Sequence, residues 1–558
     1  MGHASGTIAR PREFLIACIA GVALAILMTW PLAADLAHVG RTLPNDADGQ
    51  FSIWNIAWVA RTIVADPLDL FDANIFYPHK LTLAYSEANI LPGIIGVPAW
   101  WLTRNPWLTL NVVLLFGFAS SFACTYLLLH YLTGSRVGAT CGGIVYAFCP
   151  YVFSHLSHIQ LLMTGGIPLS MLMLHRLVDA HRTASGFSRT SVALGLALTA
   201  QALSCAYYGV FAGLMVGFAT LLLATTRGLL RNRAYWSSIA IAAATSLLIV
   251  GPLFIPFKLV QAESGFGRTV ADTAQWSAKP HGYLVSSSNA HRWLLDWSRQ
   301  FGPWDEVLFP GMFALVAGIA GVAIAVRRQS RDRETALLYG SLAVLAFWAS
   351  FGPHAGLYRL LYYLPTFSFL RAPSRLGLIV VLCLAVFAAF AVRALIGAAA
   401  PHLKGLVAAV AVCAAISDLI IVPLQWYRAP VIPSGYAALS TLPRGALAEF
   451  PFYAERVAFP LHAQYMLFST SHWLPMINGY SDVIPADFRE AAVVLGGFPS
   501  TDAFATLAKR RVRYIAVHWD MYAGRDGEIR ARLEPFLPNL KILNEDSRMS
   551  LFEVVRYP

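Results

Sequence analysis

The sequence predicts a mainly α-helical, polytopic membrane protein with a small α/β domain at its C-terminal end. Hydrophobic residues make up 57% of the 558 residues and charged residues only 13%, unlike the composition of an average soluble protein. Several stretches are almost entirely apolar over the roughly 20 residues that a membrane-spanning helix needs. Residues 424–558 differ in composition, with 14 Lys or Arg and 13 Asp or Glu. These observations divide the chain into a transmembrane domain, residues 1–423, and a more polar domain, residues 424–558.

The apolar stretches predict about eleven transmembrane helices. Residues 14–34 lack a small-residue cleavage site before the next polar loop, so we interpret them as a retained first span. Residues 88–103 are also hydrophobic, but two prolines and a Trp pair favour a kinked, interfacial or re-entrant segment that does not cross. The predicted spans are 14–34, 107–131, 138–154, 160–178, 190–207, 209–226, 236–257, 308–326, 336–350, 374–396 and 405–423.

The charges of the connecting loops predict the orientation of these spans. With a cytoplasmic N-terminus and a non-crossing 88–103, the inner connections hold 15 basic residues and four acids, the bias that the positive-inside rule describes. A crossing 88–103 would place the sequence RRQSRDR (327–333) outside. The inner basic residues are Arg10, Arg12, Arg136, Arg176, Arg182, Arg189, Arg227, Arg231, Arg233, Arg327, Arg328, Arg331, Arg333, Arg393 and Lys404, and the acids are Glu13, Asp179, Asp332 and Glu334.

This orientation places the long polar loops and the C-terminal domain on the outer face. The first outer loop, residues 35–88, holds seven acids and three bases, an unexpected charge for a loop that serves a cytosolic substrate. The other outer segments are residues 155–160, 258–306, 351–373 and 424–558.

The C-terminal domain shows patterns of both strands and helices. Short apolar runs at 446–452 and 513–519 are typical of strands, and helical periodicity covers 484–495, 501–511 and 526–536. We therefore expect a small extracytoplasmic α/β domain.

Two carboxylates, Asp46 and Asp48, stand just beyond the first span in the sequence LPNDADGQFSIWNIAW (43–58). Their predicted place is the membrane surface, the depth at which a sugar carried on a lipid phosphate would present its reacting carbon. An acceptor hydroxyl that attacks this carbon needs a general base, and a carboxylate in a partly dry pocket can serve. The alternatives are that Asp46 caps the following helix, or that both acids are simply solvated.

The layout resembles the GT-C superfamily of polyprenyl-phosphate-dependent glycosyltransferases, including protein mannosyltransferases and lipid A aminoarabinose transferases. In that superfamily a long outer loop with an acidic motif follows the first span. NDADGQFSIWNIAW (45–58) matches the position of this motif, although it reads D-x-D-G where mannosyltransferases commonly have a D-E pair. YSEANILPGIIGVPAWWL (85–102) resembles the segment that closes the same loop. FLRAPSRLGLIV (369–380) and STSHWLPMINGYSD (469–482) resemble uncharacterised bacterial members.

The resemblance implies a catalytic role for the acids of the first loop. Asp48 is the preferred general base, because Gly49 leaves the backbone open to close approach by a substrate, and Asp46 is the second choice. Glu87 is the expected companion acid, which binds a sugar hydroxyl or orients the acceptor. The sequence establishes no cofactor. If a divalent cation such as Mg²⁺ or Mn²⁺ takes part, Asp46, Asp48 and Glu87 are its expected oxygen ligands.

The stretch SHLSHIQ (154–160) is a second candidate group. His155 and His158 are three positions apart, so we expect them on one face of a helix at the outer membrane surface, with Gln160 nearby. A neutral imidazole there would hydrogen-bond a sugar or phosphate, and a protonated one would reduce the charge of a leaving phosphate. The alternative is a pair of interfacial histidines that bind backbone groups or water.

Arg371 and Arg375 flank a proline at the predicted outer start of span 374–396. The planar guanidinium suits two-pronged binding of phosphate, and a lipid phosphate leaving group gains negative charge in the transition state. The alternative is that both side chains extend to lipid headgroups.

The preferred function is an inverting glycosyltransferase of the bacterial inner membrane. Its expected partners are membrane lipids, a polyprenyl-phosphate-linked sugar and an outer-face acceptor, which is a glycan, a lipid or a protein. The basic residues do not cluster in a soluble unit, so no nucleic acid is expected. The alternative is a lipid-linked-sugar transporter or a non-catalytic glycolipid-binding protein, but Asp418 is the only clear acid deep in a predicted span, whereas a proton-coupled transporter needs several.

Overall fold

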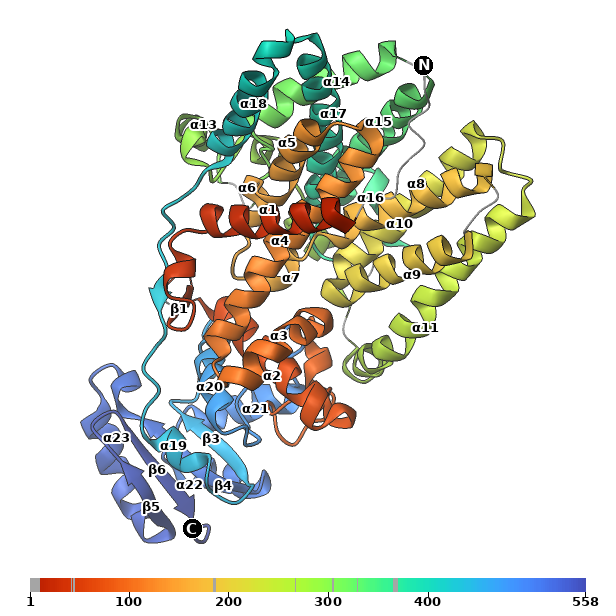
Figure 1. Cartoon of the computed structure of the whole chain (residues 1–558). Helices are drawn as coiled ribbons and strands as arrows, with labels where there is room; N and C mark the ends of the chain where they lie inside the picture. Colours follow the sequence, from red (N-terminus) through yellow and green to blue (C-terminus); the bar gives the residue numbers. More distant parts are fainter. Residues whose placement is uncertain are drawn as a thin grey trace. The chain divides into compact units, whose positions relative to one another are not determined.

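The computed structural model describes residues 11–41, 43, 46–183, 187–265, 267–303, 306–328, 330–364 and 370–558 (Figure 1). The chain forms two compact units. Unit 1 comprises Met1–Ala34, Leu114–Leu253 and Gly267–Leu424, and unit 2 comprises Asp35–Val113, Phe254–Phe266 and Gln425–Pro558. The loop after the first predicted span therefore belongs to the same unit as the C-terminal tail.

Unit 1 is helical, and each predicted span contains a helix. Seven helices of the described residues are long and apolar enough to cross a membrane: Pro11–Met28, Pro106–Thr133, Ile159–His181, Ala206–Thr226, Arg233–Ser264, Pro373–Ala398 and Pro401–Leu419. The four other predicted spans, 138–154, 190–207, 308–326 and 336–350, are also helical, but they are shorter or less apolar. The chain is a multi-pass integral membrane protein.

The helices labelled in Figure 1 have the following bounds in this part of the chain: α1 (Pro11–Met28), α4 (Pro106–Thr133), α5 (Arg136–Ala147), α6 (Pro150–Phe153), α7 (Ile159–Leu162), α8 (Gly166–Thr183), α9 (Phe187–Ser204), α10 (Ala206–Thr226), α11 (Arg233–Ser264), α12 (Val270–Gln275), α13 (Arg292–Ser298), α14 (Met312–Arg327), α15 (Ser330–Ser350), α16 (Leu357–Tyr362), α17 (Gly377–Ala398) and α18 (Lys404–Leu419). Helices α4 and α11 each contribute residues to both units.

Helix α17 is the centre of one helix group of unit 1. It packs against α5, α14 and α15, while α8, α9 and α10 pack together as a second group (Figure 1). The contact between α14 and α17 requires glycine, because a β-carbon at Gly321 would lie 1.8 Å from the carbonyl oxygen of Phe387. Small residues at such contacts let two helix backbones approach closely, which favours association inside a bilayer.

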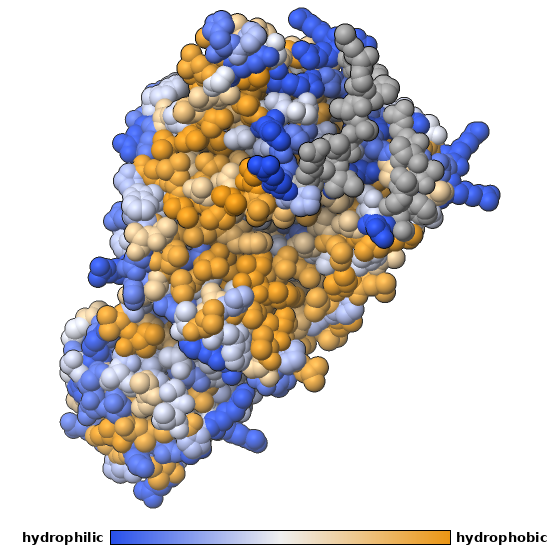
Figure 2. Space-filling model, in the orientation of Figure 1, coloured by the Kyte–Doolittle hydropathy of each residue, from blue (hydrophilic) through white to orange (hydrophobic). Residues whose placement is uncertain are grey.

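Apolar side chains also cover the outside of these helices. Leu247 and Leu248 of α11 are 69% and 76% exposed, and Val316 and Ile319 of α14 are 65% and 68% exposed. Figure 2 shows hydrophobic residues gathered over a broad surface. Contiguous apolar surface of this kind is rare on soluble proteins, and lipid tails are the solvent that it suits.

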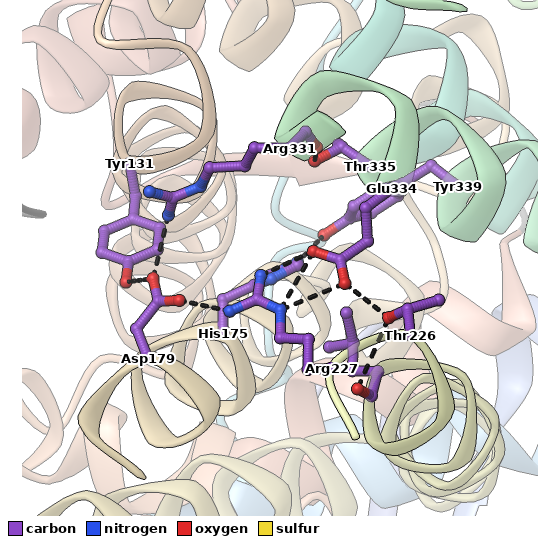
Figure 3. Close-up of polar contacts among 10 residues, drawn as sticks. Tyr131, His175, Asp179, Thr226, Arg227, Arg331, Glu334, Thr335 and Tyr339 are labelled. Atoms are coloured by element: carbon purple, nitrogen blue, oxygen red, sulfur yellow. Dashed lines mark hydrogen bonds and ion pairs between the residues drawn. The ribbon is translucent and has the colours of Figure 1, made fainter. Parts of the chain in front are cut away.

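An ion-pair network ties several of the helices of unit 1 together (Figure 3). Arg227 donates hydrogen bonds to both Glu334 oxygens, at 2.7 Å from Nη2 to Oε2, and also pairs with Asp179. Asp179 accepts further hydrogen bonds from Arg331, at 2.9 Å, and from the Tyr131 hydroxyl. Burial opposes ionisation of Glu334, but the hydrogen bonds from Arg227 and Thr226 hold its pKa below the usual range. The network joins α4, α8, α10 and α15.

Unit 2 contains the predicted C-terminal α/β domain. Strands β3 (Ala446–Phe450) and β4 (Val512–His518) are parallel and confirm the two predicted strands. The predicted helices are α21 (Ala486–Leu495), α22 (Thr501–Lys509) and α23 (Asp526–Leu533). Sequence analysis missed β5 (Leu540–Glu545) and β6 (Met549–Val554), which complete a four-stranded sheet of order β3-β4-β6-β5.

The rest of unit 2 consists of short elements around two longer helices. They are β1 (Val39–Arg41), α2 (Ala47–Ala65), α3 (Ile90–Thr103), β2 (Tyr427–Arg428), α19 (Gly435–Leu439) and α20 (His462–Phe468). Strands β1 and β2 pair antiparallel, and α2 packs against both α3 and α20. Helix α3 contains Pro98 and is shorter than the roughly 20 residues of a span. That residues 88–103 do not cross the membrane stays a prediction.

Replacing Arg227 by alanine is expected to destabilise the protein strongly. The substitution leaves Glu334 and Asp179, whose side chains are 14% and 26% exposed, without their shared cation. Breaking a buried ion pair in this way costs about 3–5 kcal/mol. Arg299→Ala is the control, because its pair with Asp296 is 65% and 70% exposed, and such pairs contribute about 1 kcal/mol or less. Thermal unfolding in detergent measures the unfolding temperature of both variants. Equal decreases in the two unfolding temperatures would contradict the prediction.

Candidate functional site

Helix α2 begins at the acidic motif of the first loop. Asp46 is its N-cap residue, because the Asp46 carboxylate accepts a hydrogen bond from the Gly49 backbone N–H at 2.8 Å. Asp46 therefore has the capping role that the sequence offered as an alternative to catalysis. The close approach at Gly49 is made by this same carboxylate, since a β-carbon there would lie 2.4 Å from the Asp46 Oδ2. Substrate access is not needed to explain this glycine.

Asp48 lies in the first turn of α2 and is half-buried. The Tyr480 hydroxyl donates a hydrogen bond to Asp48 Oδ1 at 3.0 Å. The Tyr480 ring is also held edge-on against Phe51, with ring centroids 6.2 Å apart. Two segments singled out in the sequence, 45–58 and 469–482, thus meet at Asp48.

Aromatic packing fixes α2 within unit 2. The Trp54 indole N–H donates to the Asn74 side-chain oxygen at 3.0 Å, and Asn74 donates in turn to the Ser469 hydroxyl at 3.0 Å. Trp58 packs against Trp473, with ring centroids 5.6 Å apart. These contacts bury both faces of α2 and hold its acidic end in a defined orientation.

Glu87 is attached to α2 through its backbone. The Asn55 side-chain amide donates to the Glu87 carbonyl oxygen at 3.2 Å, and Asn89 donates to the same oxygen at 3.3 Å. The Glu87 side chain is half-buried. Asp48 and Glu87 therefore stand on elements that contact each other, and their role as base and companion acid stays a prediction.

The expected metal ligands do not assemble into a metal site. Among the residues that the structure describes, no group of three or more His, Cys, Asp and Glu side chains is placed to hold a metal ion. Asp46 is already engaged as a helix cap. The arrangement of Asp46, Asp48 and Glu87 therefore does not fit a divalent cation held by all three, and we derive no step through one.

The second candidate group, residues 154–160, lies in unit 1. The prediction that His155 and His158 share one helix is wrong. Helix α6 ends at Phe153, residues 154–157 form turns, and His158 precedes the short helix α7, which contains Gln160. The Ser154 hydroxyl donates to the Tyr151 carbonyl oxygen at 2.7 Å. This side chain competes with the backbone for the hydrogen bonds that would continue the helix. His155 and His158 are still neighbours, with ring centroids 6.1 Å apart.

His155 is the more constrained of the two histidines. Its Nδ1 donates to the Tyr151 carbonyl oxygen at 2.8 Å, because a carbonyl can only accept. Its Nε2 then faces Glu306, at 3.5 Å from Oε2. Burial lowers the pKa of His155 to about 3, although the bond to the Tyr151 carbonyl opposes this shift. The imidazole is therefore held mainly neutral.

Arg375 stands in the 3₁₀ turn Pro373–Leu376 that precedes α17. Its guanidinium lies over the Tyr207 ring, 4.4 Å from the ring centroid. Its Nε is buried and has no hydrogen-bond partner, and no carboxylate of the described residues forms an ion pair with it. The Tyr151 and Tyr208 side chains, which are joined by a hydrogen bond of 3.2 Å, are buried in the same region.

Arg371 belongs to the same region. Its guanidinium lies 5.4 Å from the centroid of the Trp276 ring, and its backbone N–H donates to the Tyr207 hydroxyl at 2.6 Å. Tyr207 thus contacts both arginines. The structure brings His155, Arg371 and Arg375 together in unit 1 through Tyr151, Tyr207 and Glu306.

Glu306 is the polar residue of this region that sequence analysis missed. Its side chain is 8% exposed and accepts a hydrogen bond from the Ser374 hydroxyl at 3.0 Å. In the sequence it is one acid of a long loop, with no motif that distinguishes it. Only the structure distinguishes Glu306 from the other acids, because it shows that this acid is buried.

Comparisons with known proteins find similar structures but no similar sequence. A scan of family models and a search of curated proteins found no match to the sequence. The structure is similar to arabinofuranosyltransferase AftD from Mycobacteria, with a TM-score of 0.61 and 14% identity over 100% of this chain. It is also similar to an Archaeoglobus fulgidus oligosaccharyltransferase in complex with Zn and sulfate, with a TM-score of 0.52 and 14% identity over 94% of this chain and 70% of that one.

A third similar structure is archaeal AglB from Archaeoglobus fulgidus, in complex with an inhibitory peptide and a dolichol-phosphate, with a TM-score of 0.50 and 14% identity. This chain spans only 41% of the length of AftD. At these identities the similarity establishes the fold. The mainly α-helical membrane fold with a small C-terminal α/β domain, predicted from the sequence, is confirmed.

The two acids of the motif are expected to respond differently to substitution. Asp46→Ala should lower the free energy of unfolding by about 1 kcal/mol, because it removes the cap of α2. Asp46→Asn should change it by only a few tenths of a kcal/mol, because asparagine caps about as well. Denaturation in detergent measures the free energy of unfolding of both variants. Equal losses would show instead that the charge of Asp46, which interacts with Arg41, matters more than the cap.

Proposed function

We propose that this protein is an inverting membrane glycosyltransferase that moves a sugar from a polyprenyl-phosphate donor to an acceptor on the outer face of a bacterial inner membrane. The N-terminus is cytoplasmic and residues 424–558 are extracytoplasmic in this proposal, which rests on the loop charges. The acceptor is a glycan, a lipid or a protein.

The observation that carries the proposal is Arg375, a half-buried cation whose buried Nε has no hydrogen-bond partner among the described residues. A buried charge is normally paired or hydrogen-bonded, because its desolvation is otherwise costly. Stacking on Tyr207 compensates only part of this cost. An anionic group of a ligand would complete the site, and a phosphate suits the guanidinium fork. The dolichol-phosphate in the AglB structure supports a lipid phosphate as this group.

Asp48 is the proposed general base. In the transfer, the acceptor oxygen forms a bond to the anomeric carbon while the bond from that carbon to the phosphate oxygen breaks. The acceptor proton moves to the Asp48 carboxylate, and the phosphate leaves with the bonding electrons. Arg375, together with Arg371, stabilises the charge that grows on the phosphate. The Tyr480 hydroxyl orients the Asp48 carboxylate, and Glu87 is the proposed companion acid.

His155, His158 and Gln160 complete the proposed substrate contacts. Burial keeps the His155 imidazole neutral, which suits hydrogen bonding to the donor more than charge neutralisation. The proposal therefore assigns the positive charge at the phosphate to the arginines.

Asp48→Asn is expected to lower the rate of transfer by roughly 10²–10⁴-fold, because it removes the base. Asparagine still accepts the Tyr480 hydrogen bond, so the protein should fold. Release of polyprenyl phosphate from a panel of polyprenyl-phosphate sugars, with purified protein in nanodiscs, measures the rate. Tyr480→Phe is the matched variant, which keeps the ring against Phe51 and should cost less than Asp48→Asn. Near-normal turnover by Asp48→Asn would remove Asp48 from this role.

Arg375→Lys is expected to be harmful, because a point charge cannot reproduce a two-pronged contact with phosphate. Arg375→Ala should weaken donor binding and also slow transfer, because charge on the phosphate increases toward the transition state. Lys258→Ala is the control, since Lys258 is an exposed cation that contacts Gln261. The headgroup alternative predicts that lysine substitutes freely at Arg375. Full activity of Arg375→Lys would support that alternative.

A further inference from the structure

Glu306 is a buried acid that the proposed transfer does not use. Its side chain is 8% exposed, and the His155 side chain that faces it is 13% exposed. An acid in such a place is costly unless its oxygens are engaged. The oxygen Oε1 is engaged, because the Ser374 hydroxyl donates to it at 3.0 Å. The oxygen Oε2 lies 3.5 Å from His155 Nε2, which carries no proton in the neutral imidazole whose Nδ1 donates to Tyr151.

The contact with Ser374 reaches the turn that carries Arg375. Ser374 directly precedes Arg375, and its hydroxyl is buried and donates to Glu306. The backbone N–H of Ser374 makes only a long contact of 3.4 Å with the Trp276 carbonyl oxygen. The side-chain bond to Glu306 is therefore the shorter of the two contacts that Ser374 makes outside its own turn.

The opposite side of the turn is held by Tyr207. The Tyr207 hydroxyl accepts from the Arg371 backbone N–H at 2.6 Å, and its ring lies under the Arg375 guanidinium. The turn is thus anchored at Arg371 by Tyr207 and at Ser374 by Glu306. Loss of either anchor would let the backbone before α17 shift, and the guanidinium would shift with it.

The second oxygen of Glu306 faces His155. The Tyr151 carbonyl oxygen holds the other nitrogen of this ring, so the ring cannot turn without losing that bond. Glu306 therefore lies between two of the groups that we assign to the donor, the imidazole and the arginine turn.

We infer that Glu306 is a positioning residue, which fixes the Ser374–Arg375 backbone so that the Arg375 guanidinium is held ready for the donor phosphate. This inference rests on the proposed function. It assigns to Glu306 no contact with the substrate. The required property is the hydrogen bond that Glu306 accepts from Ser374, and not its negative charge.

A chemically similar pair elsewhere in unit 1 provides the control. Asp418, at the end of α18, lies 2.9 Å from His291 Nε2, and its other oxygen accepts from the Phe313 backbone N–H at 3.1 Å. The Ser286 hydroxyl contacts the other ring nitrogen of His291 at 2.8 Å. Within the described part of the chain this pair makes no contact with the arginine turn, so its loss should change stability alone.

The test uses the full-length protein and compares its affinity for undecaprenyl phosphate with its affinity for undecaprenol, in detergent. Glu306→Ala should raise the Kd for undecaprenyl phosphate about 10-fold or more, because a displaced Arg375 guanidinium loses a hydrogen bond to the charged phosphate. The Kd for undecaprenol should stay the same. Glu306→Gln should stay within about 3-fold of the wild type, because its amide oxygen still accepts from Ser374. Ser374→Ala should reproduce the Glu306→Ala effect in the same direction.

Asp418→Asn should lower the unfolding temperature without changing either Kd. If Glu306→Ala does not fold, Glu306→Gln and Ser374→Ala still decide the question. If Glu306→Gln binds undecaprenyl phosphate as weakly as Arg375→Ala does, the negative charge of Glu306 is required and the inference is overturned. Unchanged Kd values in Glu306→Ala and Ser374→Ala would overturn it outright. Failure of the wild type itself to bind undecaprenyl phosphate would instead reject the proposed donor, and the inference with it.

Discussion

The acidic end of α2 is held in place by residues at the far end of the chain. Asp48 and its partner Tyr480 are 432 positions apart, and Asn74, which receives the Trp54 N–H, donates to a residue 395 positions away. A helix with large aromatic side chains on several faces gains stability only when those faces are covered. The segment 469–482 provides part of this cover. The orientation of the acids in the first loop therefore depends on folding of the C-terminal region.

Two arginines, in two regions of unit 1, differ in the groups that compensate their charge. Arg227 is paired with two carboxylates, and these pairs together with the hydrogen bond from Tyr131 to Asp179 join four helices (Figure 3). Arg375 stacks on the Tyr207 ring and forms no ion pair with a carboxylate of the described residues. Networks of the first kind are complete without a ligand and stabilise the fold. A buried cation without an anion is unfavourable unless another molecule supplies the charge, which is why the second region is the better candidate for binding.

Helix positions could be predicted because apolar length and periodicity are local properties. The predicted spans contain helices, and β3, β4, α21, α22 and α23 lie where short-range patterns indicated. The turn at 154–157 was predicted as a helix, since a spacing of three residues does not show that Ser154 binds the Tyr151 carbonyl oxygen. Strand β5 was missed because its partly exposed residues, two of them charged, lack a continuous apolar pattern. Strand β6 is mostly buried, but its apolar run is too short to stand out in the sequence.

The sequence by itself determined that this is a multi-pass membrane protein, where its helices lie, and that acidic and basic candidates occur in loops. The tertiary structure decided which of those candidates have partners. Asp46 is a cap, Asp48 binds Tyr480, and Glu306 is buried against Ser374. The physical reason is distance along the chain: span length depends on neighbouring residues, whereas burial and hydrogen bonding of a loop side chain depend on segments that only folding brings near.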